Sequence, residues 1–302
     1  MALLKHLVKV DEAGRIDLIV QKLTARSRTQ VRGLFDHDCV SLNGVLCTDA
    51  GTRIVAGNEV SVSYDKNRNY KEKPRAYHSP IFELVFEDDW LLVINKKAGF
   101  LTAPNHPGEL DTVMGALSRY LNISSPRRRP VSIVHRLDRD TSGLLVFAKS
   151  DAIAQKIKVQ FEKRKPQREY LAIVAGKLKN ESGSFRNFLM TDENLNQHST
   201  NDESQGKLAI THYTVKQHFA DATLISVTLE TGRRNQIRVH FAEIGHPVLG
   251  DIRYESGLAF HSRWRAKRLA LHAALLGFKH PVTGKDLLFR AKTPEEFVKF
   301  AT

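Results

Sequence analysis

Cysteine is scarce in this sequence, since Cys39 and Cys47 are the only two among 302 residues. Two cysteines cannot build a disulfide framework, which excludes the small secreted folds held together by such bridges. One bridge is possible in principle, but so little cysteine fits a reducing cytosol better. With His37 the two thiols could hold zinc, although buried thiols are the simpler interpretation. The opening MALLKHLVKV is too short, and too interrupted by lysine and histidine, for a secretory signal. We therefore expect a cytoplasmic protein.

Long apolar runs and nucleotide-binding fingerprints are also missing. No stretch of about 18 apolar residues is present, which argues against a membrane-spanning helix. Neither G-x-x-x-x-G-K-[ST] nor the dinucleotide fingerprint occurs, so neither nucleoside triphosphate hydrolysis nor dinucleotide redox chemistry is indicated. The sequence shows no internal repeat and no low-complexity tract. We expect a globular protein that uses no cofactor.

Positive charge is in excess. Lysine and arginine total 46 against 33 aspartate and glutamate, which gives a formal net charge of +13. This balance makes polyanions, nucleic acids above all, the first partners to consider. Apolar residues make up 41% of the chain, enough to fill a core. At about 150 residues per domain, the length predicts roughly two domains.

The first part of the chain predicts a small α+β unit, which we place at residues 13–65. Apolar residues from 16 to 23 follow helical spacing, and Ser27 can cap a second helix. Alternating apolar residues then surround Asn43-Gly44, a dipeptide that suits a tight turn between strands. Residues 66–80 contain five basic residues and two prolines, so we interpret them as a basic linker. This linker lies near an RNA backbone or serves only as a solvated tether.

From residue 81 onward the pattern changes to strands with interspersed helices. Residues 112–121 predict a helix, and the polar stretch 188–206 predicts an exposed loop. The predicted strands are FELVF, WLLVINK, GLLVFAKS, YLAIVAGKL, TLISVTLE and QIRVHFA, of which the last could instead begin a helix. Many strands with scattered helices indicate an α+β fold rather than regular βαβ repeats.

The densest group of reactive side chains is VHRLDRDTSGLLVFAKS, residues 134–150. This segment reads as a polar loop followed by an apolar strand, a common setting for a functional site. Asp138 lies between Arg136 and Arg139, and nearby positive charge favours an ionised carboxylate that can act as nucleophile or base. The alternative is a plain turn, in which Asp138 and Asp140 bind backbone amides.

Two other chemistries are conceivable for this loop. Ser142 could act as a nucleophile with His135, but the sequence TSG lacks the G-x-S-x-G elbow. His135, Asp138 and Asp140 could hold a divalent ion for RNA hydrolysis, but they lack a clear ligand spacing. We predict no metal site.

The same loop carries a family resemblance. HRLDRDTSGLLVFAKS resembles the signature of the RluA-type pseudouridine synthases, and the match extends over about residues 81–300. Further segments resemble the other motifs of the family and occur in the family's order. They are FEDDWLLVINKKAGFLTAP, REYLAIVAGKL, GKLAITHY, TGRRNQIRVHFAEIGHPVLGDIRY and LALHAALLGFKHPVTGK. The resemblance implies an α+β catalytic domain at residues 81–302. Its sheet would be mixed and mainly antiparallel, with the active cleft across the sheet face. The implied reaction is isomerisation of uridine to pseudouridine in RNA, without a cofactor.

The resemblance also implies roles for single residues. Asp138 falls on the catalytic aspartate, and Arg238 on the basic residue that pairs with it. Tyr170 falls on the tyrosine that packs against the target base, and Arg136 on the arginine that enters the RNA stack as the uridine flips out. Arg233 is a candidate for phosphate contact or structural support.

Three features depart from the family's pattern. Lys97 stands where proline usually follows lysine. Arg234 and Asn235 replace a frequent Thr-His pair, and Arg168 replaces a common lysine two positions before Tyr170. The departures concern the substrate and leave the aspartate, tyrosine and arginine in place.

The small unit at 13–65 resembles the alpha-L RNA-binding domain of ribosomal protein S-four type. The resemblance rests on RIDLIVQKL, SRTQVRGLF, VSLNGV and GNEVSVSY. Arg26, Arg28 and Arg32 would line its RNA face, because basic groups clustered near a helix start can be presented together. The alternative is an ordinary helix surface.

Together these features predict an RNA pseudouridine synthase, an isomerase in which an RNA-binding domain precedes the catalytic domain. Ribosomal RNA is the expected substrate, and transfer RNA remains open. A non-catalytic RNA-binding factor for ribosome assembly and a metal-dependent RNA hydrolase are the rival functions. The sequence does not set the oligomeric state, and a monomer is our expectation.

Overall fold

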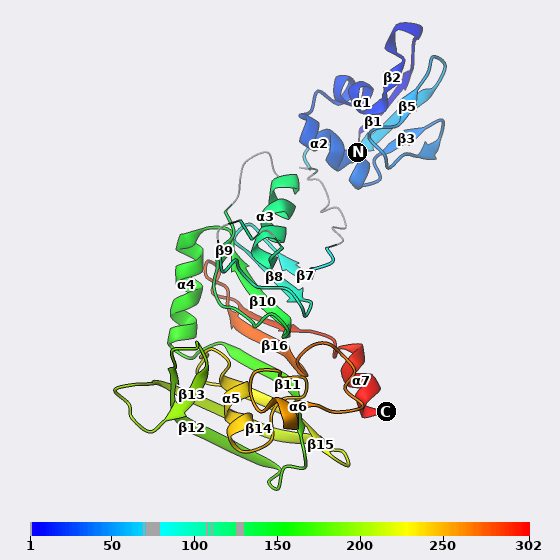
Figure 1. Cartoon of the computed structure of the whole chain (residues 1–302). Coiled ribbons are helices and arrows are strands. Elements are labelled where there is room, and N and C mark those ends of the chain that lie inside the picture. The colour runs from blue at the N-terminus through cyan, green and yellow to red at the C-terminus, as the bar shows by residue number, and fades with distance from the viewer. Residues whose placement is uncertain (1, 69, 71–78, 107, 110, 125–129) are drawn as a thin grey trace. The chain divides into compact units, whose positions relative to one another are not determined.

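The computed structural model divides into two compact units, a small unit Met1–Tyr77 and a large unit His78–Thr302 (Figure 1). The structure describes residues 2–68, 70, 79–106, 108–109, 111–124 and 130–302. Most of the predicted basic linker at 66–80 therefore lies outside the described residues. Among the residues described, no helix is both long and apolar enough to cross a membrane.

The small unit packs two helices against short strands. Its elements are β1 (Ala2–Leu7), a 3-10 turn (Val10–Glu12), β2 (Gly14–Arg15), α1 (Ile16–Thr24), α2 (Arg28–Asp36), β3 (Val40–Leu42), β4 (Val45–Leu46), β5 (Arg53–Ile54) and β6 (Glu59–Tyr64). The main sheet has the order β1-β6-β3-β4, and β2 pairs separately with β5. β1 was not predicted from the sequence, yet it pairs antiparallel with the whole of β6.

Local sequence explains the ends of these elements. Ser27 caps α2 as predicted, since its hydroxyl accepts from the Gln30 amide and the Gln30 side chain accepts from the Ser27 amide. The predicted turn at Asn43-Gly44 is confirmed, because it joins β3 to β4 with φ of 52° and 77° at these two residues. The helix–helix–strand order of the sequence is thus fixed by a cap and a turn.

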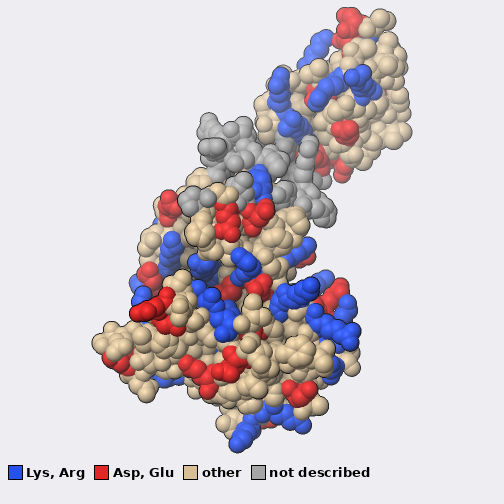
Figure 2. All heavy atoms as spheres, in the orientation of Figure 1, with Lys and Arg blue, Asp and Glu red and all other residues tan. Residues whose placement is uncertain are grey.

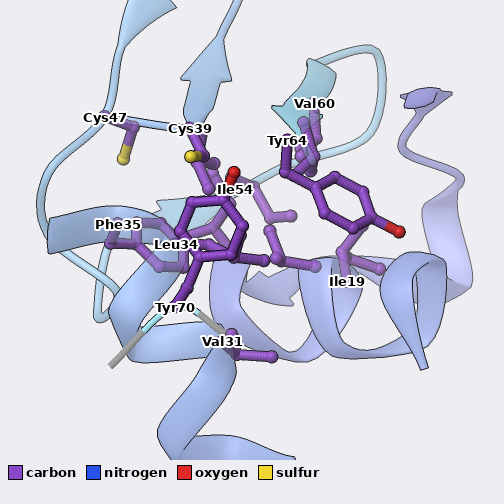
Figure 3. Packing of buried hydrophobic residues seen from close by; sticks show 14 of the residues in the cluster. Ile19, Val31, Leu34, Phe35, Cys39, Cys47, Ile54, Val60, Tyr64 and Tyr70 are labelled. Atoms are coloured by element: carbon purple, nitrogen blue, oxygen red, sulfur yellow. The ribbon is translucent and has the colours of Figure 1, made fainter. Parts of the chain in front are cut away.

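The core of the small unit is apolar (Figure 3). Leu34 and Phe35 of α2 pack with strand residues such as Ile54 and Val60, all of them almost fully buried. Cys39 and Cys47 are free thiols buried in this cluster. Their sulfur atoms lie 3.4 Å from the His37 carbonyl and 3.5 Å from the Asp49 carbonyl, respectively. The two cysteines thus serve as small core residues.

The large unit is built on one long sheet. Its strands are β7 (Phe82–Glu87), β8 (Leu91–Lys96), β9 (Ser132–Ile133), β10 (Ser142–Ala148), β11 (Gln167–Ala175), β12 (Ser182–Thr191), β13 (Gln197–Thr200), β14 (Lys207–His218), β15 (Ala222–Leu229), β16 (Leu271–Lys279) and β17 (Asp286–Arg290). The order is β13-β12-β14-β15-β11-β16-β10-β8-β7, with β17 on β16 and β9 on β10. Among the described strands only the β10–β16 pair is parallel. The predicted α+β class with a mixed, mainly antiparallel sheet is confirmed.

The helices of the large unit lie against this sheet (Figure 1). They are α3 (Val113–Ser124), α4 (Asp151–Glu162), α5 (Gln236–Glu243), α6 (Ser256–Ala259) and α7 (Glu295–Ala301). α4 buries Ile153 and Ile157 against Val93 of β8 and Val146 of β10. This packing covers β10, the strand that follows the reactive loop, which lies between β16 and β8 in the sheet.

The predicted exposed loop at 188–206 is only partly right, because residues 192–196 and 201–206 are turns but 188–191 and 197–200 belong to strands. β12 continues to Thr191 and pairs with β13, in a register that sets Phe188 opposite Thr200. β13 forms the outer edge of the sheet, where only one side of the backbone needs a partner and polar side chains can face solvent. A polar sequence therefore concealed an edge hairpin.

The segment QIRVHFA is a helix rather than the strand it resembles. Its apolar residues alternate, which favours a strand, but the segment lies in α5, where residues 236–242 are all buried. Because the helix is covered on every side, its sequence lacks the polar face that marks a surface helix. Its polar residues are paired inside the protein: His240 contacts Thr211 and Asn187 at 2.9 and 2.8 Å.

Candidate active site

The reactive loop is anchored by backbone contacts before it enters β10. Thr102 Oγ1 donates to the Leu137 carbonyl at 2.8 Å and accepts from the Leu137 amide at 3.1 Å. The Gly99 amide donates to the Arg139 carbonyl at 2.9 Å. Together these bonds fix the backbone on both sides of Asp138, so the direction of its side chain is set by the fold.

A buried lysine supports the same loop. Lys96 ends β8 with only 1% exposure, and its ammonium donates to the carbonyls of Lys97, Phe100 and Arg139 at 2.9, 2.7 and 2.7 Å. Burial lowers the pKa of Lys96 to about 7, while the charges of Asp140 and Asp138 oppose that shift. The three carbonyl acceptors match the three hydrogens of the ammonium form, so Lys96 ties the 97–100 segment to the reactive loop at Arg139.

Gly143 is required where the loop joins the strand. It has a φ of 118°, which side-chain-bearing residues rarely adopt, and a Cβ there would lie 2.3 Å from the Ala273 carbonyl oxygen. The close approach allows Ser142 and Gly143 to pair with His272 and Ala273 in the parallel β10–β16 ladder. The glycine thus brings the loop beside β16.

Asp138 is held through one oxygen only. Its Oδ2 accepts from Asn235 Nδ2 at 2.6 Å and from Arg238 Nη1 at 3.0 Å. Its Oδ1 makes no hydrogen bond with the described residues, and the side chain is 29% exposed. The carboxylate is therefore oriented by two donors while its other oxygen remains available to a substrate.

Arg238 lies between two carboxylates. Its Nε and Nη2 bind the two oxygens of the fully buried Asp251 at 2.6 and 2.8 Å, and its third nitrogen reaches Asp138. Its guanidinium also lies over the Tyr254 ring, 5.0 Å from the centroid. Burial alone would lower the pKa of Arg238, but Asp251 and Asp138 outweigh it and raise the pKa. Arg238 is a fixed positive charge beside Asp138.

Tyr170 lies in the same cavity as Asp138. It belongs to β11, is 8% exposed, and lines a cavity of about 70 Å³ together with Asp138, Arg136, Arg233 and Arg238. We call this space the Asp138 cavity. Burial raises the pKa of Tyr170, with a smaller opposing effect of Arg168. The phenol is therefore neutral near pH 7, with its ring edge or face available to a planar ligand.

The structure brings together five of the residues singled out by sequence. Asp138, Tyr170 and Arg238 meet in the Asp138 cavity, and the predicted pairing of Asp138 with Arg238 is present as an ion pair. Arg136 is exposed where it lines this cavity. Arg233 lines it too, but its Nε donates to the Leu208 carbonyl at 2.9 Å, which favours a structural role.

The three arginines predicted for the RNA face of the small unit differ from one another. Arg26 donates to the Lys66 and Arg68 carbonyls at 2.9 and 3.3 Å, and its guanidinium lies 5.1 Å from the Tyr64 ring centroid. Arg28 and Arg32 are both exposed on α2. Arg26 thus also ties α2 to the end of its own unit.

The alternative chemistries considered for the loop are not supported by its geometry. Ser142 Oγ lies 2.7 Å from Nδ1 of His272, not against His135. His135 accepts from the Val146 amide at 3.2 Å and stacks on Phe161, and burial lowers its pKa to about 3. Within the part of the chain that the structure describes, no three His, Cys, Asp or Glu side chains gather as a metal-binding group.

Sequence reasoning missed three residues that shape this site. Asn235 was noted only as a departure from the family, yet it donates to the Asp138 carboxylate. Asp251 and Lys96 were contained in quoted motifs without a role. A signal was available for both, since an ionisable residue inside an apolar stretch must find a partner when buried.

Fold and site together define an enzyme, in which a partly desolvated carboxylate with one open oxygen faces an aromatic ring. A family model described as RNA pseudouridylate synthase matches residues 90–243. The chain is 36% identical to ribosomal large subunit pseudouridine synthase D of Vibrio cholerae, covering 98% of this chain and 93% of that protein. It is also 36% identical to the protein of the same name from Zymomonas mobilis, covering 93% and 91%. The human RNA pseudouridylate synthase domain containing 4 has the same fold, with a TM-score of 0.59 and 23% identity over 72% of this chain and 90% of that one.

The chain belongs to the RNA pseudouridylate synthase family. It is an isomerase that converts uridine to pseudouridine in RNA. The resemblance seen in the sequence is thereby confirmed.

Proposed function

We propose that this chain isomerises specific uridines of ribosomal RNA and that Asp138 is its central catalytic residue. The observation that carries the proposal is the way Asp138 is held, with Oδ2 bound by Asn235 and Arg238 and Oδ1 left open in the cavity. A carboxylate fixed in this way, beside the positive charge of Arg238, can act on a substrate placed against Oδ1.

The reaction fits these residue types. The N1–C1′ bond of uridine breaks, the uracil turns, and C5 bonds to C1′; C5 then loses a proton while N1 gains one. Atoms and electrons balance without any redox partner or energy source. The Asp138 carboxylate assists cleavage by bonding to C1′ or by stabilising positive charge on the sugar, and both routes require the ionised form.

Tyr170 and Arg136 suit the handling of the flipped base. Taking a uridine out of its stack costs a few kcal/mol. The Tyr170 ring lines the Asp138 cavity and can stack on the uracil, while the exposed Arg136 can fill the space that the base leaves. Stacking contributes about 1–3 kcal/mol per base, enough to offset much of this cost.

We assign RNA binding to residues 13–65 of the small unit, joined by a basic linker at 66–80 to the catalytic domain at 81–302. The exposed Arg28 and Arg32 on α2 support contacts with phosphates, which attract guanidinium groups strongly. Arg26 stands between α1 and α2 and donates to the Lys66 and Arg68 carbonyls, so it links the start of α2 to the first residues of the linker.

The names of the relatives favour ribosomal RNA of the large subunit as substrate, and that substrate implies action in the cytoplasm. The test is to incubate the purified chain with unmodified transcripts of large-subunit RNA, small-subunit RNA and transfer RNA, and to map pseudouridine in each. The Asp138→Asn variant serves as the inactive control.

We expect pseudouridine at one or a few positions of the large-subunit transcript and none with the variant. Product confined to transfer RNA would overturn the substrate assignment. Absence of product from every RNA, with the wild-type chain folded, would overturn the proposed function itself.

A further inference from the structure

A second cavity lies beside the Asp138 cavity. Its wall includes residues that support the reactive loop, namely Lys96, Gly99, Ser142 and His272, but neither Asp138 nor Tyr170 lines it. It has a volume of about 840 Å³, within the size range of roughly 300–1,000 Å³ typical of ligand sites. Leu271 lines the Asp138 cavity and His272 lines the second one. Successive residues of a strand point to opposite faces of the sheet, so the two cavities flank β16.

Lysines from three separate segments converge on this second cavity, which we call the lysine cavity. Lys97 follows β8, Lys267 precedes β16, and Lys292 follows β17. All three are exposed, and none of their ammonium groups has a hydrogen bond or ion pair with the described residues. Figure 2 shows lysine and arginine atoms gathered around the middle of the large unit.

The floor of the lysine cavity adds a buried positive charge. The Arg268 side chain is 9% exposed, and it donates to Ser142 Oγ at 2.7 Å and to the carbonyls of Leu269 and Leu271 at 3.1 Å each. These three acceptors are uncharged, so they anchor the guanidinium in place, and the carboxylate of Glu296 lies 3.9 Å away. A fixed cation beneath a basic rim attracts anions more strongly than mobile surface lysines do.

The acidic residues of the same cavity already have partners. Glu83 accepts from Asn95 at 3.3 Å, Glu295 pairs with Lys299 at 3.4 Å, and Glu296 lies 3.9 Å from Arg268. Glu83 keeps its negative charge, because the Asn95 amide is neutral. Six lysines and arginines nevertheless line the cavity against three glutamates, so its lining is basic overall. Such a concave basic surface fits phosphate groups.

We propose that the lysine cavity binds backbone phosphates of a part of the RNA substrate that lies away from the target uridine. This proposal rests on the proposed function, because it assumes that the substrate is a large RNA. The position on the other face of β16 gives it a specific consequence: a short hairpin that fills only the Asp138 cavity does not reach the lysines. The cavity thus selects for large, structured RNA.

The test compares two charge-matched triple variants of the full chain. In the first, Lys97, Lys267 and Lys292 are each replaced by Gln. In the control, three exposed lysines that line neither cavity and have no side-chain partner among the described residues, Lys179, Lys216 and Lys285, are each replaced by Gln. Binding to a long large-subunit RNA fragment and to a short hairpin with the target uridine is measured at several salt concentrations.

The first variant should bind the long RNA more weakly, with a log–log salt slope smaller by roughly 2–3, at about 0.7–0.9 for each lost contact. Its hairpin binding should match that of the control. Equal long-RNA slopes for the two variants would overturn the proposal and leave the lysines to another partner, such as an acidic protein. Equal weakening on the short hairpin would also overturn it. Neither result affects the proposed function, which fails only if the wild-type chain forms no pseudouridine.

Discussion

The two units of this protein treat charge in opposite ways. Among the described residues, every buried polar or charged side chain lies in the large unit, including Lys96, Arg238, Asp251 and His240. The small unit has an apolar core and keeps its charges at the surface. Burying charge is costly unless each group finds a partner. In the large unit this cost accompanies a site whose chemistry needs a partly desolvated carboxylate. The small unit needs only exposed cations, because these are enough to bind phosphates.

This contrast is tested most strongly by removing a buried charge. Arg238→Ala should lower the unfolding free energy of the large unit by about 3–5 kcal/mol, because Asp251 is left buried without its cation. It should also slow catalysis by about 10²–10³-fold, as expected when one charged donor is lost. Lys5→Ala breaks an exposed ion pair of the small unit at 3.3 Å and should cost less than about 1 kcal/mol. Urea unfolding followed by circular dichroism measures both, and equal losses would remove the contrast.

Acid should weaken the large unit through its buried histidines. Burial lowers the pKa of His135 to about 3 and those of His240 and His272 to about 4. Unfolded histidine has a pKa near 6.5. Below that pH these histidines bind protons in the unfolded chain but stay neutral in the folded unit. The unfolding free energy therefore falls as pH drops from about 6.5 towards 4. Each histidine contributes up to about 1.4 kcal/mol per pH unit.

Tryptophan fluorescence can follow the unfolding of the large unit, because the two tryptophans, Trp90 and Trp264, both lie in it. Urea unfolding followed by tryptophan fluorescence therefore reports this unit alone. A midpoint that stays constant between pH 6.5 and 4.5 would contradict the neutral, buried state of these histidines.

A smaller effect is expected at the second donor to Asp138. Asn235→Ala removes a hydrogen bond to a carboxylate, worth about 1.5–3 kcal/mol, so the single-turnover rate should fall about 10–100-fold. Tyr254→Phe removes the hydroxyl, which donates to Asn235 Oδ1 at 3.2 Å and accepts from the Gln197 amide at 3.0 Å. It keeps the ring under Arg238, so the loss of rate should be smaller. A larger loss from Tyr254→Phe than from Asn235→Ala would show that Asn235 does not orient the carboxylate.

The smallest effect concerns the small unit. Arg28→Gln should reduce the log–log salt slope of RNA binding by about 0.7–0.9, the loss of one phosphate contact, and leave stability unchanged. Arg26→Gln should instead destabilise the unit, because Arg26 binds two backbone carbonyls and lies over Tyr64. Salt-dependent RNA binding and thermal melts of both variants distinguish an arginine that contacts RNA from one that stabilises the small unit. The assignment fails if Arg28→Gln leaves the slope at the wild-type value.

Much of the fold could be predicted because its signals are local. Ser27 with Gln30, and Asn43 with Gly44, define a helix start and a turn within four residues. The signals failed where burial or an edge overrides the local pattern. α5 is buried on all sides and shows no polar face, and the β12–β13 hairpin is polar because it lies at the sheet edge.

From local patterns alone the site was predictable only where its residues share one motif, and Tyr170 and Arg238 were reached only through the family resemblance. Asp138 and Arg136 stand in a single loop, but Asn235 and Arg238 reach Asp138 from 97 and 100 residues away. Contacts at that separation depend on how β10 and α5 are brought together, which no local pattern encodes. Asp251 is a further case, since its partner Arg238 becomes visible only once the helix is built.

The account is tested most directly by measuring rate and affinity together for Asp138→Asn. The amide keeps the shape of the side chain and an oxygen that can accept from Arg238 and Asn235, but it removes the negative charge. Single-turnover pseudouridine formation should be lost with saturating large-subunit RNA, while the dissociation constant for that RNA stays at its wild-type value. Near-normal turnover by the variant, or loss of RNA binding in step with loss of product, would contradict the central role of the Asp138 carboxylate.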